Sequence, residues 1–103
     1  MITAITTTHW LVLAAALFGI GLLGVLTRRN VLVILVSVEL MLNAANLAFV
    51  AMGHHLGDVQ GQVVALVVMA IAAAEATVGL AIIVLVKRSC RTLNPDELTE
   101  LRE

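Results

Sequence analysis

Residues Val31–Met52, VLVILVSVELMLNAANLAFVAM, decide the fold, because this apolar run is long enough to cross a membrane as one helix. It contains one ionisable side chain, Glu39, and two amides, Asn43 and Asn46, follow at helical spacing. At about 100° per residue the three side chains fall within about 60° of one another, which predicts a polar stripe on an apolar helix. A carboxyl group inside an apolar span is costly and is functional by default.

The composition of the whole chain requires a lipid environment. Its 103 residues are 61% apolar, with a mean hydropathy of +1.08, and a soluble domain of this size cannot bury that much apolar surface. Apolar runs cover residues 10–26, 31–52 and 63–86, each near the roughly 20 residues that span a hydrocarbon core. Because the runs do not alternate, they exclude a β-barrel. We expect an all-α integral membrane protein, with three transmembrane helices in a single domain over residues 1–103.

The positive charges predict how the chain crosses the membrane. The six Lys and Arg residues are Arg28 and Arg29 between the first two runs, and Lys87, Arg88, Arg91 and Arg102 after the third. By the positive-inside rule, the N-terminus lies outside and the tail of residues 87–103 is cytoplasmic. The net charge of −1 argues against nucleic acid as a partner. Cys90 is the only cysteine and falls in the cytoplasmic tail, so no disulfide is expected.

The segment GIGLLG, Gly19–Gly24, matches a dinucleotide-binding fingerprint by its letters alone. That fingerprint works at a strand-to-helix turn, whereas this segment lies inside a lipid-spanning run, so we reject the match. Gly21 and Gly24 lie about 60° apart on a helix, and we expect them to form a shallow face for close helix packing. The turn Thr27–Asn30 predicts that the first two helices form an antiparallel hairpin.

The segment Gly53–Gln62, GHHLGDVQGQ, is predicted to be a solvated outer loop. His54, His55 and Asp58 suggest metal ligands, but adjacent histidines point in different directions and no fourth ligand is near. No metal site is therefore expected in this segment.

A second acid, Glu75, lies in the third run within AIAAAEATVGL, residues 70–80. Counted from the cytoplasmic ends of their runs, Glu39 lies roughly 12 Å deep and Glu75 roughly 16 Å deep at 1.5 Å per residue. Two acids at one level on different helices are what a lateral proton path requires. Because burial disfavours a fixed charge, such groups take up and release protons.

The other polar residues leave alternatives open. Asn43 and Asn46 either bond the carboxyl groups or bridging water, or only join neighbouring helices. Arg28 and Arg29 either set the topology and contact lipid phosphate, or contact a partner subunit near a proton entrance. No nucleophile–base set, phosphate loop or redox-ligand pattern is present, so no self-contained catalytic site is expected. No Lys or Arg lies within a run, so a neutralising cation has to come from another subunit.

The blocks RRNVLVILVSVELMLNAANLAFV and GQVVALVVMAIAAAEATVGLAIIVLVKR closely resemble the NuoK (4L-type) family, over about residues 10–88. The resemblance implies a non-redox membrane subunit of proton-pumping NADH:quinone oxidoreductase, respiratory complex I, in the bacterial inner (plasma) membrane. Its implied neighbours are the quinone-side small subunits and an antiporter-like subunit. It also implies that this chain binds no cofactor, while NADH, FMN, iron–sulfur clusters and quinone act elsewhere in the parent complex.

The resemblance implies roles for particular residues. Glu39 and Glu75 match the family's buried acids, of which the acid in the second helix matters most, and Arg28 and Arg29 match its loop arginines. Many members carry an aspartate directly before the Gly-Gln of the third helix, whereas here Asp58 lies three residues earlier, so its role does not carry over.

Other classes of protein remain as alternatives. The nearest alternative is the homologous small subunit of a multisubunit sodium/proton antiporter or membrane-bound hydrogenase. Those relatives look less acidic at the positions of Glu39 and Glu75. A multidrug exporter needs four spans, a rotor-ring proteolipid needs two, and a non-catalytic scaffold does not account for paired acids.

Overall fold

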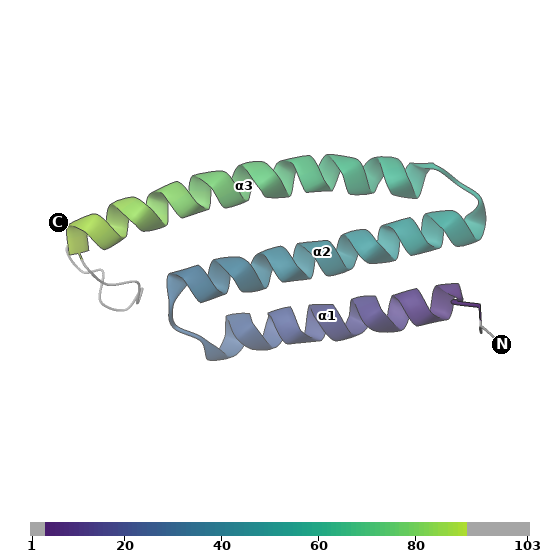
Figure 1. Cartoon of the computed structure of the whole chain (residues 1–103), viewed down its shortest axis with the longest axis horizontal. Coiled ribbons are helices and arrows are strands. Elements are labelled where there is room, and N and C mark those ends of the chain that lie inside the picture. The colour runs from purple at the N-terminus through teal and green to yellow at the C-terminus, as the bar shows by residue number, and fades with distance from the viewer. Residues whose placement is uncertain (1–3, 91–103) are drawn as a thin grey trace.

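The computed structural model describes residues 4–90, which form three helices joined by short connections (Figure 1). Helix α1 is Thr7–Thr27, α2 is Val31–Leu56 and α3 is Gln60–Cys90. Each is long and apolar enough to cross a membrane, so the all-α fold with three spans is confirmed. The single domain over residues 1–103 and the sides on which the termini lie stay predictions. The predicted tail continues α3 as far as Cys90, and from residue 91 it lies outside the described residues.

The helices extend beyond the apolar runs, and the predicted loop Gly53–Gln62 is wrong over most of its length. Helix α2 continues through His54 and His55 and ends before Gly57, whose φ of 67° lies in the left-handed region. Helix α3 begins at Gln60, whose backbone N–H donates to Asp58 Oδ1 at 2.9 Å. Hydropathy falls at the edge of the membrane, but a helix ends only where a residue stops its hydrogen-bond ladder.

The other helix boundaries also have local causes. Before α1, the backbone N–H of Thr6 donates to His9 Nδ1 at 3.0 Å. Before α2, Asn30 Oδ1 accepts from the N–H of Leu32 at 2.8 Å, as an N-cap residue does. Only residues 28–30 separate α1 from α2, so the predicted antiparallel hairpin is confirmed.

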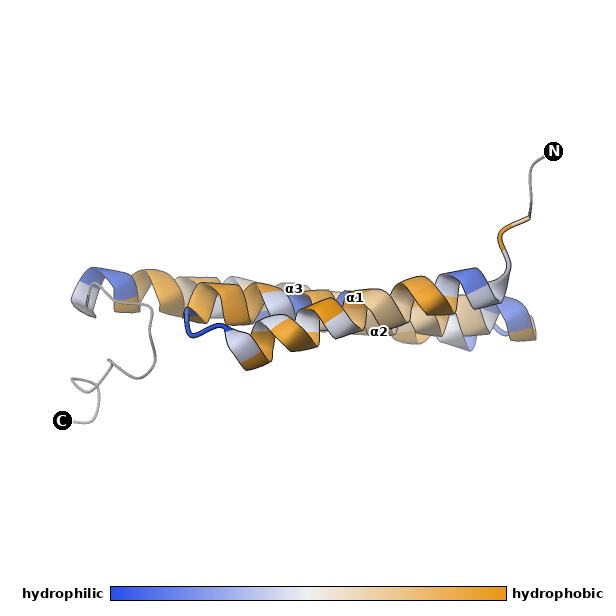
Figure 2. Ribbon diagram, turned by 90° about the horizontal axis from the view of Figure 1, so that it is seen from below, coloured by the Kyte–Doolittle hydropathy of each residue, from blue (hydrophilic) through white to orange (hydrophobic). Residues whose placement is uncertain are grey.

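The three helices lie in a single layer, with α2 between α1 and α3 (Figure 1). Turned by 90°, the molecule shows the layer edge-on, with hydrophilic residues gathered towards its two ends (Figure 2). Only 11%, 17% and 11% of the residues in the most apolar windows of α1, α2 and α3 are buried within the chain. The remaining apolar surface is available to lipid or to other subunits.

Helix α1 packs against the face of α2 that carries Ser37 and Met41. A Cβ atom added to Gly21 would lie 2.6 Å from Met41 Cγ and 2.8 Å from the backbone oxygen of Ser37. One added to Gly24 would meet Ser37 Oγ. The predicted close approach at Gly21 and Gly24 is therefore confirmed, and only glycine allows it.

Helix α3 packs against the opposite face of α2, at two places that fix the register of the pair. Near one end, a Cβ added to Gly79 would lie 3.2 Å from Leu35 Cδ1. Near the other, a Cβ added to Gly61 would lie 2.9 Å from Gly53 Cα. Between these contacts α3 buries Ala65 and Ala72, so small side chains line much of its contact with α2.

Candidate functional site

The register of α2 and α3 places Glu39 and Glu75 at the same level along the two helices. Glu39 comes four residues after Leu35, and Glu75 comes four residues before the opposing Gly79. From the other contact, Glu39 comes fourteen residues before Gly53, and Glu75 comes fourteen after the opposing Gly61. Both counts give the same level, because rise per residue is equal in two antiparallel α-helices.

The two carboxyl groups differ in how far the chain encloses them. Glu39 is half-buried, and its Oε1 atom is buried without a hydrogen-bond partner among the described residues. Glu75 is exposed on the surface of the chain. The reason is angular: Glu75 is offset by about 60° from Ala72, which is buried against α2. It therefore lies at the margin of the α2–α3 contact, on the surface of the chain.

The polar stripe predicted on α2 divides at the edge of the α2–α3 contact. Asn46 is seven residues before Gly53 and eleven after Leu35, so it shares the face that packs on α3. It is buried, with 7% of its surface exposed, and neither its Nδ2 nor its Oδ1 atom has a hydrogen-bond partner in residues 4–90. Asn43 is exposed. The stripe thus contains one enclosed amide and one accessible amide.

Arg28 and Arg29 both lie exposed in the connection between α1 and α2. At this end of the layer α3 also ends, with Lys87 and Arg88 in its last turn, so positive residues gather there (Figures 1 and 2). Their placement is compatible with both interpretations of the arginine pair, as a topology signal and as a partner contact.

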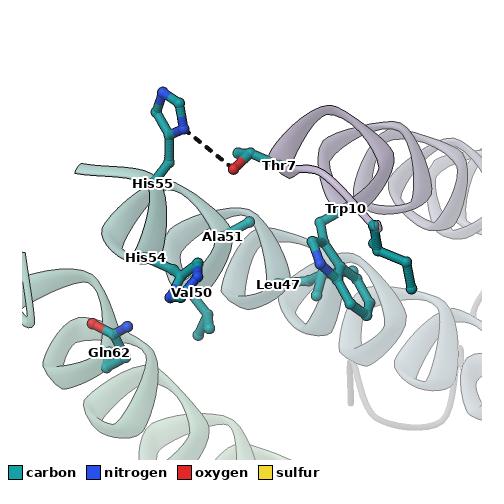
Figure 3. A pocket seen from close by; sticks show the side chains of 9 residues that line it. Thr7, Trp10, Leu47, Val50, Ala51, His54, His55 and Gln62 are labelled. Carbon is teal, nitrogen blue, oxygen red and sulfur yellow. Dashed lines mark hydrogen bonds between the residues drawn. The ribbon is translucent and has the colours of Figure 1, made fainter. Parts of the chain in front are cut away.

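A pocket of about 620 Å³ opens at the other end of the layer, where the first turn of α1 meets the last turns of α2. Figure 3 shows Trp10, His54, His55 and Gln62 around it, with Thr7 Oγ1 and His55 Nδ1 3.3 Å apart. The two histidine rings point in different directions, and no group of three or more His, Cys, Asp or Glu residues within 4–90 is placed to hold a metal ion. The sequence does not predict this pocket, because its walls come from the start of α1, the end of α2 and the start of α3, which carry no common signal.

Comparison with known proteins gives one consistent result. The family model described as NADH-ubiquinone/plastoquinone oxidoreductase chain 4L matches residues 9–103. NADH-quinone oxidoreductase subunit K of Anaeromyxobacter sp. (strain K) is 56% identical over 95 residues, covering 92% of this chain and 96% of the relative. The subunit K of Thermomicrobium roseum is 54% identical over 99 residues (96% and 97% covered). That of Neisseria meningitidis serogroup C is 52% identical over 99 residues (95% and 98% covered). On the extent of the family match and on these identities, the chain belongs to the family of NADH-ubiquinone/plastoquinone oxidoreductase chain 4L.

Proposed function

We propose that the chain relays protons through Glu39 and Glu75, as a subunit of the membrane arm of proton-pumping NADH:quinone oxidoreductase, complex I. Its family membership makes it a subunit of this enzyme, and its three spans make it a multi-pass membrane protein, in bacteria of the plasma membrane. The proposal therefore concerns which residues act and how.

The observation that carries the proposal is the register of α2 and α3. Two independent contacts, Leu35 with Gly79 and Gly53 with Gly61, bring the only two acids within the apolar runs to one level. Structural polar residues with no common task have no reason to match in this way. Within residues 4–90 the one other acid is Asp58, in the connection between α2 and α3, so a proton leaving one carboxyl group has the other as the acidic acceptor at its own level.

The surroundings of Glu39 support a functional role for its carboxyl group. Its Oε1 atom is buried without a hydrogen-bond partner among the described residues, and the apolar runs of the chain contain no Lys or Arg to neutralise it. A carboxyl group in an apolar span is costly, and an acid retained there without a neutralising cation is functional by default. Passing a proton to a neighbouring acid is a function that a carboxyl group can perform at this position.

The exposure of Glu75 supports a route that continues into a neighbouring subunit. In the isolated chain this acid would face lipid, which is costly, so a protein surface has to cover it in the complex. We place the quinone-side small subunits on one side of the layer and an antiporter-like subunit on the other. A basic side chain opposite Glu75 on one of these neighbours would complete the site.

The chain's own contribution is to bind and pass protons, without redox chemistry. Glu39, Glu75 and the two amides of α2 supply carboxyl and amide groups, which exchange or orient protons but carry no electrons. NADH, FMN, iron–sulfur clusters and quinone act in other subunits of the complex.

The substitution Glu39→Gln tests the proposal, because glutamine keeps the shape and hydrogen bonding of the side chain but cannot exchange a proton at neutral pH. We expect the complex to assemble, as judged by native gels, while NADH-driven proton pumping in membrane vesicles falls by about a hundredfold or more, the scale of losing one proton-transfer group. Undiminished pumping in an assembled complex would refute the role of Glu39.

Two further variants define the relay. Glu75→Gln should reduce pumping less, because a neighbouring subunit completes its surroundings, and the double variant should abolish it. Asp58→Asn is the matched control: Asp58 lies in the connection between α2 and α3, and its Oδ1 cap of Gln60 is retained by asparagine. Pumping in this control should equal that of the unmodified enzyme. No observation favours the antiporter or hydrogenase alternative, and the relatives compared above are all subunits of NADH-quinone oxidoreductase.

A further inference from the structure

Asn46 is a buried amide without a hydrogen-bond partner in the described part of the chain. Both of its polar atoms are buried and lack a hydrogen-bond partner, and Glu39 Oε1, two helical turns away on the same face of α2, is in the same condition. Buried polar groups are normally hydrogen-bonded, and an orphaned amide destabilises the state that contains it. Three such atoms along one helix contact therefore indicate that this contact has a second state.

The chain itself offers these atoms no partner on α3. Counting seven residues from the Gly53–Gly61 contact places Asn46 opposite Val68, and the buried residues on either side are Ala65 and Ala72. None of these three side chains has a donor or an acceptor. A neighbouring subunit cannot supply one either, because Asn46 is already enclosed by this chain, with 7% of its surface exposed. Water is the one donor and acceptor small enough to enter.

Entry of water requires α2 and α3 to separate slightly or the amide to turn, because its polar atoms have essentially no exposed surface in the closed arrangement. The facing residues make this separation easy. Apart from Val68, the facing residues on α3 are the small Gly61, Ala65, Ala72 and Gly79, and small side chains lose few packing contacts when helices part. In lipid, moreover, no hydrophobic driving force holds the helices together beyond that packing.

We propose that the α2–α3 contact is a hydratable seam, defined by Glu39 and Asn46 on α2 and by Ala65, Val68 and Ala72 on α3. In its closed state the seam is dry and the amide is orphaned. In its open state water hydrogen-bonds to both polar atoms of Asn46 and reaches Glu39 Oε1. Asn46 is then a positioning residue, which acts on Glu39 through water.

The spacing suits a short chain of waters. Seven residues separate Glu39 from Asn46, which is about 10 Å along the helix, or roughly three hydrogen-bonded waters. The seam leads from Glu39 towards the connection of α2 with α3, where the pocket of Trp10 and His54 opens. This deepens the proposed function, and rests on it, by giving Glu39 a proton path on that side which exists only while the seam is open.

A cysteine on the α3 wall tests hydration without removing any polar group. In the whole complex, in membrane vesicles oxidising NADH and with Cys90→Ser as background, Ala72→Cys should react with a small water-soluble methanethiosulfonate. The label is followed by the mass of this chain. Ala14→Cys is the matched control, because Ala14 is 5% exposed and Ala72 is 7% exposed, but Ala14 is buried in α1, away from the seam. We expect Ala72→Cys to react at least ten times faster than Ala14→Cys.

The amide itself is tested in the same background. Adding Asn46→Leu, which keeps the branched arrangement of side-chain heavy atoms and removes both polar atoms, should slow the labelling of Ala72→Cys to the rate of the control. Adding Asn43→Leu, which changes the exposed amide, should leave it fast. Equal rates for Ala72→Cys and Ala14→Cys, or fast labelling that persists with Asn46→Leu, would overturn the proposal.

Measuring proton pumping beside cysteine labelling distinguishes the hydratable seam from the proposed proton relay. Proton pumping should fall several-fold in Asn46→Leu and recover in Asn46→Ser, whose hydroxyl group binds water. If Glu39→Gln pumps normally while the labelling pattern is as expected, the relay fails and the seam stands. If Glu39→Gln stops pumping while Ala72→Cys stays unlabelled, the seam fails and the relay stands.

Discussion

At residue 21, the absence of a side chain sets how closely α1 and α2 approach. A Cβ atom there would meet the backbone oxygen of Ser37, which cannot move without moving α2. At Gly24 the obstacle is the Ser37 side chain, and at Gly19 nothing lies within 4 Å. The three glycines of one short motif therefore have three different tolerances for a methyl group.

These tolerances predict a graded series of alanine variants. Gly19→Ala should leave the complex as stable as before. Gly21→Ala should destabilise the α1–α2 contact by roughly 1–3 kcal/mol, the usual range for overpacking. Gly24→Ala should do the same but be partly rescued by Ser37→Ala, which removes the clashing oxygen. The measurement is the temperature at which the complex dissociates on native gels. Equal losses at all three positions would contradict the assigned contacts.

The sequence predicts that the polar side chains of α2 share one side of the helix, but it does not predict which of them are buried. Spacing alone places Glu39, Asn43 and Asn46 on one side of a helix. Which amide is enclosed depends on where α3 packs, and the contact of Gly53 with Gly61 sets that position. Glu75 shows the same limit, since its exposure follows from the angle at which α3 meets α2.

At the scale of the elements, three helices followed directly from three apolar runs, because lipid leaves the backbone no other way to satisfy its hydrogen bonds. The ends of the helices could not be predicted from the apolar runs, because hydropathy marks the edge of the lipid and not the residue at which a helix ends. His54 and His55 extend α2 beyond its apolar run until Gly57 ends it. Asp58 then caps α3 from within the connection.

The end of α2 gives a prediction about Gly57. Its φ of 67° is unfavourable for a residue with a Cβ, although nothing lies within 4 Å of where that atom would be. Gly57→Ala should therefore cost about 1–2 kcal/mol through backbone strain alone. Gly57→Asn should cost less, since asparagine tolerates the left-handed region. Thermal dissociation of the complex measures both variants, and an alanine variant as stable as glycine would rule out the strain.

At the scale of the whole molecule, the layer has two ends that differ in charge. The connection of α1 with α2 carries Arg28 and Arg29, and α3 ends beside it with Lys87 and Arg88. The connection of α2 with α3 carries Asp58 and no positive residue. The positive-inside rule therefore predicts that the arginine end faces the cytoplasm.

Accessibility to a membrane-impermeant thiol reagent checks this orientation. With Cys90→Ser as background, Leu56→Cys near the end of α2 should react with the reagent added to spheroplasts, in which the outer face of the plasma membrane is accessible. Thr27→Cys, at the other end of the layer, should react only after the membrane is opened. Both positions are exposed in the chain, so burial does not confuse the comparison. The reverse pattern would invert the assigned topology.

The single layer also has a consequence for how the chain is made. Helix α2 packs on α1 through its Ser37 face and on α3 through its Glu39 face, and both connections are short. A ribosome that has delivered only α1 and α2 to the membrane has thus completed one hairpin, while Glu39 and Asn46 still lack the helix that covers them. During that interval the nascent chain presents a carboxyl group and an amide to the insertion machinery or to lipid. The arrival of α3 encloses Asn46 and leaves Glu39 half-buried, so the two side chains are covered only when the third helix has been inserted.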